Sequence, residues 1–264
     1  MTFEDSDSTV EIIRPGWQVA DKVRAFTTTR QGGVSAAPWD SFNLATHVND
    51  SEDDVKQNRD RLIQNFNLPA EPVWLQQTHS DSIVSLTKNN LSGHFKADAA
   101  YTTETNIVCC VMTADCLPVL FCNKQANWVA AVHAGWKGIA NGILKKTLDT
   151  FCEIDGANKL QDLNVWIGPA ISGQVYQVGE DVRQCFIRQD TKLEKAFQVD
   201  TNKPGSYLLD NARAAQLQLR SQGLDATQIA RDSHCTFTDK ERFFSYRRDG
   251  VNSGRMATLI WLDS

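Results

Sequence analysis

Three short apolar runs follow one another closely in the middle of the chain, and they limit the possible folds more than any other feature. They are Ile107 to Met112, Leu117 to Cys122 and Trp128 to Val132, and polar turn residues separate them. Runs of five or six residues rich in Val, Ile and aromatics are typical of strands rather than helices. A strand with one solvent-exposed face alternates apolar and polar residues, whereas these runs are apolar throughout. The sequence therefore predicts a sheet that is covered on both faces.

Helix and strand signals surround these runs without a strict alternation. Ser51 followed by three acidic residues predicts the start of a helix that ends before Pro69. Strands outnumber helices, so the predicted fold class is α/β, a single-domain α/β sandwich with a mixed β-sheet over residues 1–264 and a flexible tail over residues 1–10. Further predicted elements are helices over Ile139–Phe151 and Leu209–Ser221, and strands over Leu163–Ile167, Arg242–Tyr246 and Met256–Leu262.

Charge and cysteine content exclude several classes of protein. The net charge is −5, which argues against a general basic face that coats nucleic acid or an anionic membrane. The first residues are acidic and resemble no secretory signal, and no apolar run approaches the ~20 residues that span a bilayer. Seven cysteines, an odd number, fit reduced thiols. We therefore expect a cytoplasmic protein with neither nucleic acid nor membrane as a partner; the oligomeric state does not follow from the sequence.

Two histidines and one cysteine lie where predicted strands meet loops. His133 directly follows one apolar run, Cys116 directly precedes another, and His79 ends the segment that begins at Trp74. Side chains at neighbouring strand ends converge on one edge of a sheet. Two imidazoles and one thiolate suit Zn²⁺, and three protein ligands leave a fourth position open for catalysis. There is no close-spaced pair of ligands, so the spacing alone is a weak signal.

The same residues allow a second interpretation without metal. Cys116 could be a nucleophile and His133 its base, as in cysteine hydrolases, with Asp98 or Asn43 as the group that orients the imidazole. The residue types fit both interpretations, and the sequence pattern does not decide between them.

Several cationic and glycine-rich segments are candidate anion sites. The segment from Gly135 to Gly138 precedes a predicted helix, but its spacing fits neither the phosphate loop nor the dinucleotide fingerprint, and a plain turn explains it as well. The candidate arginines are Arg30, Arg247 and Arg248. Alternatively, these arginines form ion pairs within the protein: Arg30 with Asp40, and either Arg247 or Arg248 with Asp249.

Ordered strings over most of the chain carry a family resemblance. They are Thr28–Ser35, Ser41–Leu44 with His47–Val48, Asn58–Arg59, Gln77–His79, Lys96–Ala99, Thr113–Pro118, His133–Gly138, Ile167–Ile171, Cys235–Thr236, and Phe243–Asp249 with Ser253–Arg255. From about Arg24 to Leu262 the chain thus resembles the YfiH or laccase-domain family, also called polyphenol oxidase or peptidoglycan editing factor. Two positions depart from the family pattern: Ser80 stands where Gly is frequent, and Lys137 where Arg is usual.

The resemblance implies a function and a set of site residues. It implies zinc held by His79, Cys116 and His133, and a fold similar to the catalytic domain of cytotoxic necrotising factors, whose Cys-His pair deamidates glutamine. The implied activities are phosphorolysis of adenosine, inosine, guanosine and methylthioadenosine, and deamination of adenosine. The expected partners are therefore small-molecule nucleosides and phosphate, and the expected substrate or phosphate ligands are Arg30, Asn43, Arg247 and Arg248.

Copper-dependent oxidation of phenols is the alternative activity, with copper in place of zinc, and amide hydrolysis in peptidoglycan editing is another. Multicopper oxidases need ~10 or more histidines across several copper centres. This chain has five, so the sequence does not favour a laccase.

Overall fold

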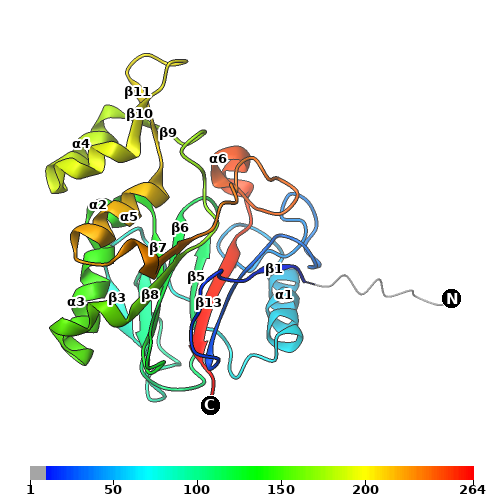
Figure 1. Cartoon of the computed structure of the whole chain (residues 1–264). Coiled ribbons are helices and arrows are strands. Elements are labelled where there is room, and N and C mark those ends of the chain that lie inside the picture. Colours follow the sequence, from blue (N-terminus) through cyan, green and yellow to red (C-terminus); the bar gives the residue numbers. More distant parts are fainter. Residues whose placement is uncertain (1–9) are drawn as a thin grey trace.

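Two β-sheets lie face to face in the centre of the molecule, and helices cover the outer face of each (Figure 1). The computed structural model describes residues 10–264, apart from the side chains of residues 157 and 158. The tail expected over residues 1–10 lies outside this range except for Val10, which is buried. The α/β sandwich with a mixed sheet that the sequence predicts is confirmed.

The first sheet has four antiparallel strands in the order β1-β2-β13-β5. They are β1 (Ile12–Ile13), β2 (Val23–Thr28), β13 (Met256–Leu262) and β5 (Cys109–Thr113). Its central pair, β2 and β13, brings together segments from the two ends of the chain.

The second sheet has six strands in the order β12-β8-β6-β7-β4-β3 and is mixed. The outer pairs, β12 with β8 and β3 with β4, are parallel, and the inner pairs are antiparallel. The strands are β12 (Ile229–Arg231), β8 (Leu163–Ile167), β6 (Leu117–Asn123), β7 (Val129–Ala134), β4 (Ala99–Thr102) and β3 (Ile83–Ser85). All three central apolar runs thus form strands, and they lie in both sheets: β5 in the first, β6 and β7 in the second.

Helices form the outer layers. Helix α1 (Glu52–Asn65) packs on the first sheet, with Ser51 as its N-cap as predicted. Helices α2 (Trp136–Ala140), α3 (Ile143–Asp155) and α5 (Asn211–Ser221) cover the second sheet. A small antiparallel sheet, β10-β11-β9, projects at the top of Figure 1 beside α4. Its strands and the remaining helices are β9 (Gln177–Gly179), α4 (Glu180–Gln189), β10 (Phe197–Val199), β11 (Ser206–Leu209), α6 (Tyr246–Asp249) and the 3₁₀ segments Ala157–Asp162, Thr191–Ala196, Ala226–Gln228 and Gly250–Asn252.

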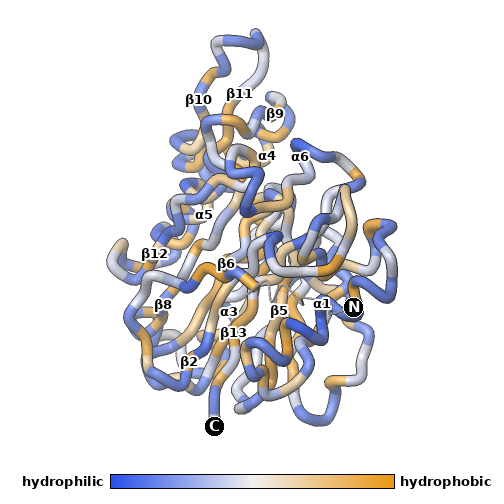
Figure 2. Tube along the Cα trace, turned by 90° about the vertical axis from the view of Figure 1, so that its right-hand side faces the viewer, coloured by the Kyte–Doolittle hydropathy of each residue, from blue (hydrophilic) through white to orange (hydrophobic). Residues whose placement is uncertain are grey.

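The apolar strands are explained by the layers on either side of them. Along β6, Val119 and Phe121 pack against the helical layer, whereas Leu120 and Cys122 pack against the first sheet. Every residue of β6 is buried for this reason. Figure 2 shows the same arrangement, with hydrophobic residues along the central strands and hydrophilic ones in the outer loops.

Two predicted elements differ from the structure. The single helix predicted over Ile139–Phe151 is two helices, because Gly142 has a φ of 88°, a left-handed conformation that ends α2 before α3 begins. The strand predicted over Arg242–Tyr246 is wrong: the segment is a loop that leads into α6, and Ser245 caps that helix by accepting a hydrogen bond from the Arg248 N–H. Its two phenylalanines are buried, but no strand within residues 10–264 pairs with them.

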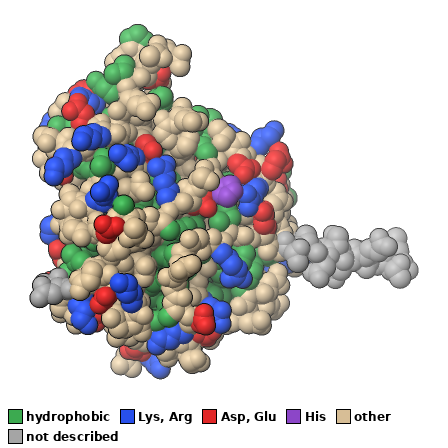
Figure 3. All heavy atoms as spheres, viewed as in Figure 1, with side chains coloured by type: hydrophobic (Ala, Val, Ile, Leu, Met, Phe, Trp, Pro, Cys, Tyr) green, Lys and Arg blue, Asp and Glu red, His purple; other side chains and the backbone are tan. Residues whose placement is uncertain are grey.

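The surface agrees with the charge balance. On the face seen in Figure 3, Lys and Arg side chains are interspersed with Asp and Glu. In the described part of the chain, none of the helices has the length and apolar character that a membrane crossing requires.

Candidate metal centre and pocket

Strand register brings the candidate residues to one edge of the second sheet. In the β6-β7 pair, Leu117 lies opposite Ala134, so Cys116 and His133 meet at the same end. In the β4-β7 pair, Ala99 lies opposite Val132, and the His133 N–H donates to the backbone oxygen of Asp98 at 2.7 Å. Three segments that are distant in sequence therefore end side by side.

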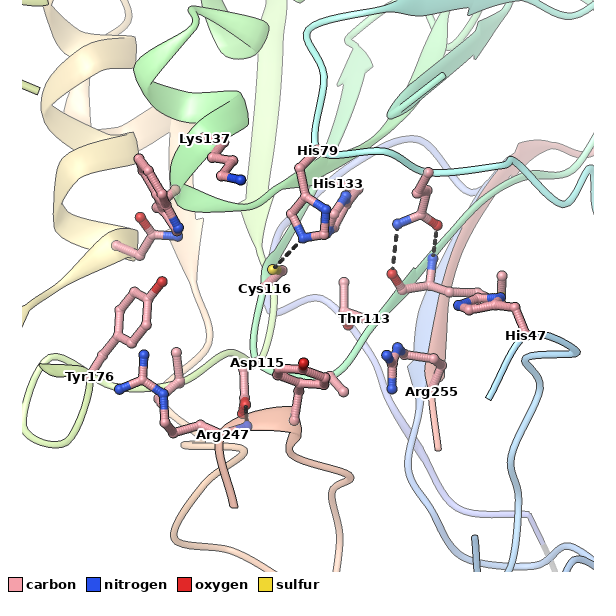
Figure 4. Close-up of a pocket in the computed structure, with 17 residues that line it drawn as sticks. His47, His79, Thr113, Asp115, Cys116, His133, Lys137, Tyr176, Arg247 and Arg255 are labelled. Atoms are coloured by element: carbon pink, nitrogen blue, oxygen red, sulfur yellow. Dashed lines mark hydrogen bonds between the residues drawn. The ribbon is translucent and has the colours of Figure 1, made fainter. Parts of the chain in front are cut away.

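His79 completes the group from a loop. Its Nε2 lies 3.7 Å from Cys116 Sγ, and its ring lies edge-on to that of His133 with centroids 4.8 Å apart (Figure 4). One ligand atom from each of the three residues falls within 4.8 Å of the others. Gly135 leaves the space for this, because a Cβ there would lie 2.9 Å from His79 Cδ2 and 3.1 Å from Cys116 Sγ.

Asp98 orients both histidines from behind the cluster. It is fully buried, and its Oδ1 lies 2.8 Å from His133 Nδ1 while accepting the His79 N–H at 3.0 Å. Its Oδ2 accepts from the backbone N–H groups of Thr78 and Ser80 and from the Ser80 hydroxyl. These bonds hold His79 at a φ of 59° and assign the Nδ1 proton of His133, which leaves His133 Nε2 available as a ligand. Ser80, which departs from the family pattern, thus has a role in this network.

The cluster also perturbs the acidity of its members. Burial opposes ionisation of Cys116, but His133 and His79 outweigh it and lower the pKa of the thiol. Burial alone would lower the pKa of His133, yet Cys116 and Asp98 raise it. Burial likewise disfavours the charged form of Asp98, but hydrogen bonds from His133 and Ser80 hold its pKa well below the usual range. The geometry favours a thiolate next to an imidazole whose orientation is fixed.

These donors fit a metal ion. A thiolate and two imidazoles prefer a borderline cation such as zinc, and the carboxylate behind His133 is the outer partner that metal-binding histidines commonly have. The same Cys116, His133 and Asp98 geometry also satisfies the nucleophile, base and orienting acid of a cysteine hydrolase. Of the two orienting groups considered from the sequence, the structure brings Asp98 to His133.

The cluster opens into a cavity of about 480 Å³, which is the size of a small-molecule site. Of the predicted site residues, His79, Cys116, His133 and Arg247 line it, together with Trp136 and Lys137 from the start of α2. Arg247 is exposed, donates to the Gln177 oxygen and lies over the Tyr176 ring. The other lining residues are His47, Gln77, Met112, Thr113, Ala114, Asp115, Ile171, Tyr176, Asn211, Tyr246 and Arg255.

Three predicted ligands do not line this cavity, because internal partners hold them elsewhere. Arg30 pairs with Asp40 at 3.1 Å, donates to backbone oxygens and lies over a phenylalanine ring, and these internal partners hold it away from the cavity. Arg248 pairs with Asp249 at 2.8 Å. Asn43 bonds within its own loop, and its Oδ1 accepts the Arg255 N–H. Asn43 therefore supports a cavity residue from outside.

His47, Tyr176, Asn211 and Arg255 are among the polar residues of the cavity that sequence reasoning missed. His47 and Arg255 stand in the strings that carry the resemblance, which is the signal that could have identified them. Tyr176 and Asn211 stand in no such string. Figure 4 shows the Tyr176 hydroxyl directed into the cavity.

Comparison with known proteins places these observations in a family. Residues 24–263 match the family described as multi-copper polyphenol oxidoreductase laccase. The chain is 46% identical to a purine nucleoside phosphorylase of Haemophilus influenzae, over 96% of this chain and all of the relative. It is 43% identical to the purine nucleoside phosphorylase YfiH of Escherichia coli, over 96% and 99%. A solved structure, the hypothetical protein YfiH of Bacillus licheniformis, superposes with a TM-score of 0.88 at 33% identity and covers 98% of both chains.

Proposed function

Because the chain belongs to the laccase-domain (YfiH) family, we propose that it is a zinc-dependent purine nucleoside phosphorylase that also deaminates adenosine. The observation that carries the proposal is the cluster of His79, Cys116 and His133 at the wall of a cavity large enough for a nucleoside. The names of relatives that the chain matches over nearly its full length support the phosphorylase activity in particular.

In this proposal His79, Cys116 and His133 hold the metal. Zinc would supply Lewis acidity that lowers the pKa of water toward ~7 and so serves the deaminase activity. Asp98 keeps the Nδ1 proton on His133 and fixes the loop that carries His79. This outer support matters because a ligand that is free to turn loses affinity for its metal.

Phosphorolysis asks mainly for positioning and charge. A phosphate oxygen bonds to C1′ of the ribose as the bond from C1′ to the purine nitrogen breaks, and the base leaves with the electron pair and takes up a proton. Cationic side chains of the cavity would hold the phosphate in line with C1′. Burial raises the pKa of Tyr176, so its hydroxyl keeps its proton and can donate a hydrogen bond inside the cavity.

One observation favours a second candidate, a metal-free amide hydrolase. Asp98, His133 and Cys116 form a chain of the kind that activates a nucleophilic thiol. The two functions differ in whether the thiol holds metal or attacks a carbonyl, so the metal requirement separates them.

The experiment is incubation of the purified, zinc-loaded protein with adenosine, with and without phosphate, followed by chromatographic separation of the products. Phosphorylase activity releases adenine and ribose 1-phosphate only with phosphate, and deaminase activity releases inosine and ammonia in both cases. The variant Cys116→Ser should lose both activities and its zinc, whereas Cys185→Ser, at an exposed cysteine of α4, should keep them.

Two results would contradict the proposal. If nucleosides remain unchanged while phenols turn over with copper, the chain is an oxidase. If the metal-free protein cleaves an amide and zinc inhibits it, the hydrolase is the correct function.

A further inference from the structure

The polar groups of the cavity are divided between its two sides. Arg255 and Thr113 lie together where β13 begins and β5 ends, since Met256 pairs with Thr113, and His47 lines the same cavity. Figure 4 shows these three on one side of the metal cluster and Tyr176 and Lys137 on the other. On the basis of the proposed phosphorylase function, we propose that phosphate binds at Arg255 and His47, and that the nucleoside lies on the opposite side of the cluster, near Asn211.

Arg255 is the cation of the cavity that most needs an anion. It is partly buried, and one of its guanidinium nitrogens donates to the backbone oxygens of Ser253 and Gly254. Within residues 10–264 no carboxylate lies within ion-pair distance of it, in contrast to Arg30 and Arg248. A guanidinium removed from water without a counter-ion is costly, so an anionic ligand here gains more than one at an exposed cation.

Arg255 has a second potential donor and a second cation close to it, His47 and Arg59. Burial lowers the pKa of His47, and the charges of Arg255 and Arg59 lower it further, so His47 is a neutral imidazole with one N–H to donate beside Arg255. Arg59 itself lies over the Trp74 ring and donates to the Leu44 oxygen. Arg255 and His47, which line the cavity, can supply donors to the several oxygens of phosphate.

Two buried side-chain oxygens in the cavity wall have no hydrogen-bond partner among the described residues, and they differ in kind. Thr113 Oγ1, next to Arg255, belongs to a hydroxyl and can donate. Asn211 Oδ1, on α5, can only accept. The Asn211 amide nitrogen faces the Ala134 oxygen at 3.3 Å, which fixes the carbonyl oxygen in its unpaired position. Since a carbonyl repels phosphate but accepts from a purine N–H or a ribose hydroxyl, the two sides differ in the ligand they favour.

The competing phosphate ligand is Arg247. It is exposed at the rim, where its guanidinium donates to the Gln177 oxygen, and water already solvates its charge. This makes Arg247 the weaker candidate, and it gives the test a direct rival.

The first test is steady-state phosphorolysis in Arg255→Met, Arg247→Met and Arg188→Met, the last at an exposed arginine of α4 as the control for charge. Hydrogen bonds to charged groups predict a KM for phosphate raised by roughly 10- to 100-fold in Arg255→Met, with the KM for nucleoside changed by less than about threefold. If Arg247→Met raises the KM for phosphate and Arg255→Met does not, the proposal is overturned. Should Arg255→Met fail to fold, Arg255→Lys is used, since it keeps the charge but loses the planar donors and should show the same selective rise.

The second test needs no turnover. Phenylglyoxal modifies accessible arginines, and mass spectrometry reads the extent at Arg255 with and without inorganic phosphate. If phosphate protects Arg255 from phenylglyoxal but the protein has no phosphorylase activity, the proposed function is refuted and the anion site at Arg255 is supported. Phosphorolysis without protection of Arg255 would keep the function and overturn the inference.

The other side of the cavity has its own variant. Asn211→Leu keeps the number and branching of the side-chain heavy atoms but removes the unpaired oxygen and the amide nitrogen that bonds Ala134, so we expect the KM for nucleoside to rise by about tenfold while the KM for phosphate stays unchanged. A rise in the KM for phosphate alone would reverse the proposed orientation and overturn it.

Discussion

Replacing Asp98 with Asn tests whether the buried carboxylate organises the metal cluster. The substitution keeps the size of the side chain but removes its charge and one of its two acceptor atoms. In the native protein Oδ1 serves His133 and the His79 N–H, and Oδ2 serves the Thr78 and Ser80 N–H groups. An amide cannot satisfy both sets, so one of two costs must follow.

If the amide nitrogen takes the place of Oδ2, the backbone N–H groups of Thr78 and Ser80 lose their acceptor. At about 1–3 kcal/mol for each buried unsatisfied group, the native state loses roughly 2–6 kcal/mol. For a chain of this length that corresponds to a decrease in Tm of roughly 5–20 °C. In the flipped orientation, the amide nitrogen takes the place of Oδ1 and faces His133 Nδ1. The imidazole proton must then move to Nε2, the atom that a metal would need. Zinc affinity should then fall by about 10- to 100-fold.

The measurements are the Tm of the metal-free protein and the zinc Kd by competition with a chelator. Asp81→Asn is the matched control, because Asp81 lies in the same loop but is partly exposed and pairs with Lys146, an interaction worth only about 0–1 kcal/mol. A protein with Asp98→Asn whose Tm stays within about 1 °C and whose zinc Kd stays within about twofold of the native values would refute the organising role of Asp98.

In the metal-free protein, iodoacetamide should modify Cys116 with a midpoint below the ordinary thiol pKa of about 8.5, and Cys185 gives the comparison within one mass-spectrometric experiment. The pKa of Cys116 is lower in the folded protein than in the unfolded chain, so its thiolate stabilises the fold above about pH 8.5. This contribution is lost as the pH falls through the folded pKa. Denaturation at several pH values should show the loss. Gly135→Ala should lose zinc, measured by metal analysis, because its Cβ would meet His79 at 2.9 Å, whereas Gly138→Ala, with its nearest contact at 3.3 Å, should retain it. Arg30→Ala should lower the Tm and leave the KM for phosphate unchanged; the opposite pattern would return Arg30 to the phosphate site.

Much of the fold follows from local sequence pattern. The apolar runs around Val111, Val119 and Val132 predict buried strands because both of their faces meet apolar layers, and the structure confirms all three. The pattern does not say which sheet each strand joins. β5 pairs with β13 from the end of the chain, and a contact of that sequence separation leaves no periodicity to detect.

The candidate site divides in the same way. Residue type and position beside predicted strands marked Cys116 and His133 as candidates, because the ends of neighbouring strands meet at an edge of the sheet, whereas His79 reaches them from a loop. Local sequence does not separate the arginines of the cavity from the structural ones. An arginine in a loop has the same sequence context whether it faces a cavity or an internal carboxylate. Arg30 pairs with Asp40, whereas Arg255 faces the cavity without a carboxylate.

The sequence by itself thus determined the central buried strands, the N-cap of α1 and the three metal-ligand candidates, each of which depends on local periodicity or residue chemistry. Only the tertiary structure decided that Asp98 lies behind His133, that Asn43 supports Arg255 from outside the cavity, and that Tyr176 and Asn211 complete its wall. The physical reason is that strand register and sheet order bring these residues together across long stretches of chain, and both depend on the packing of all layers at once.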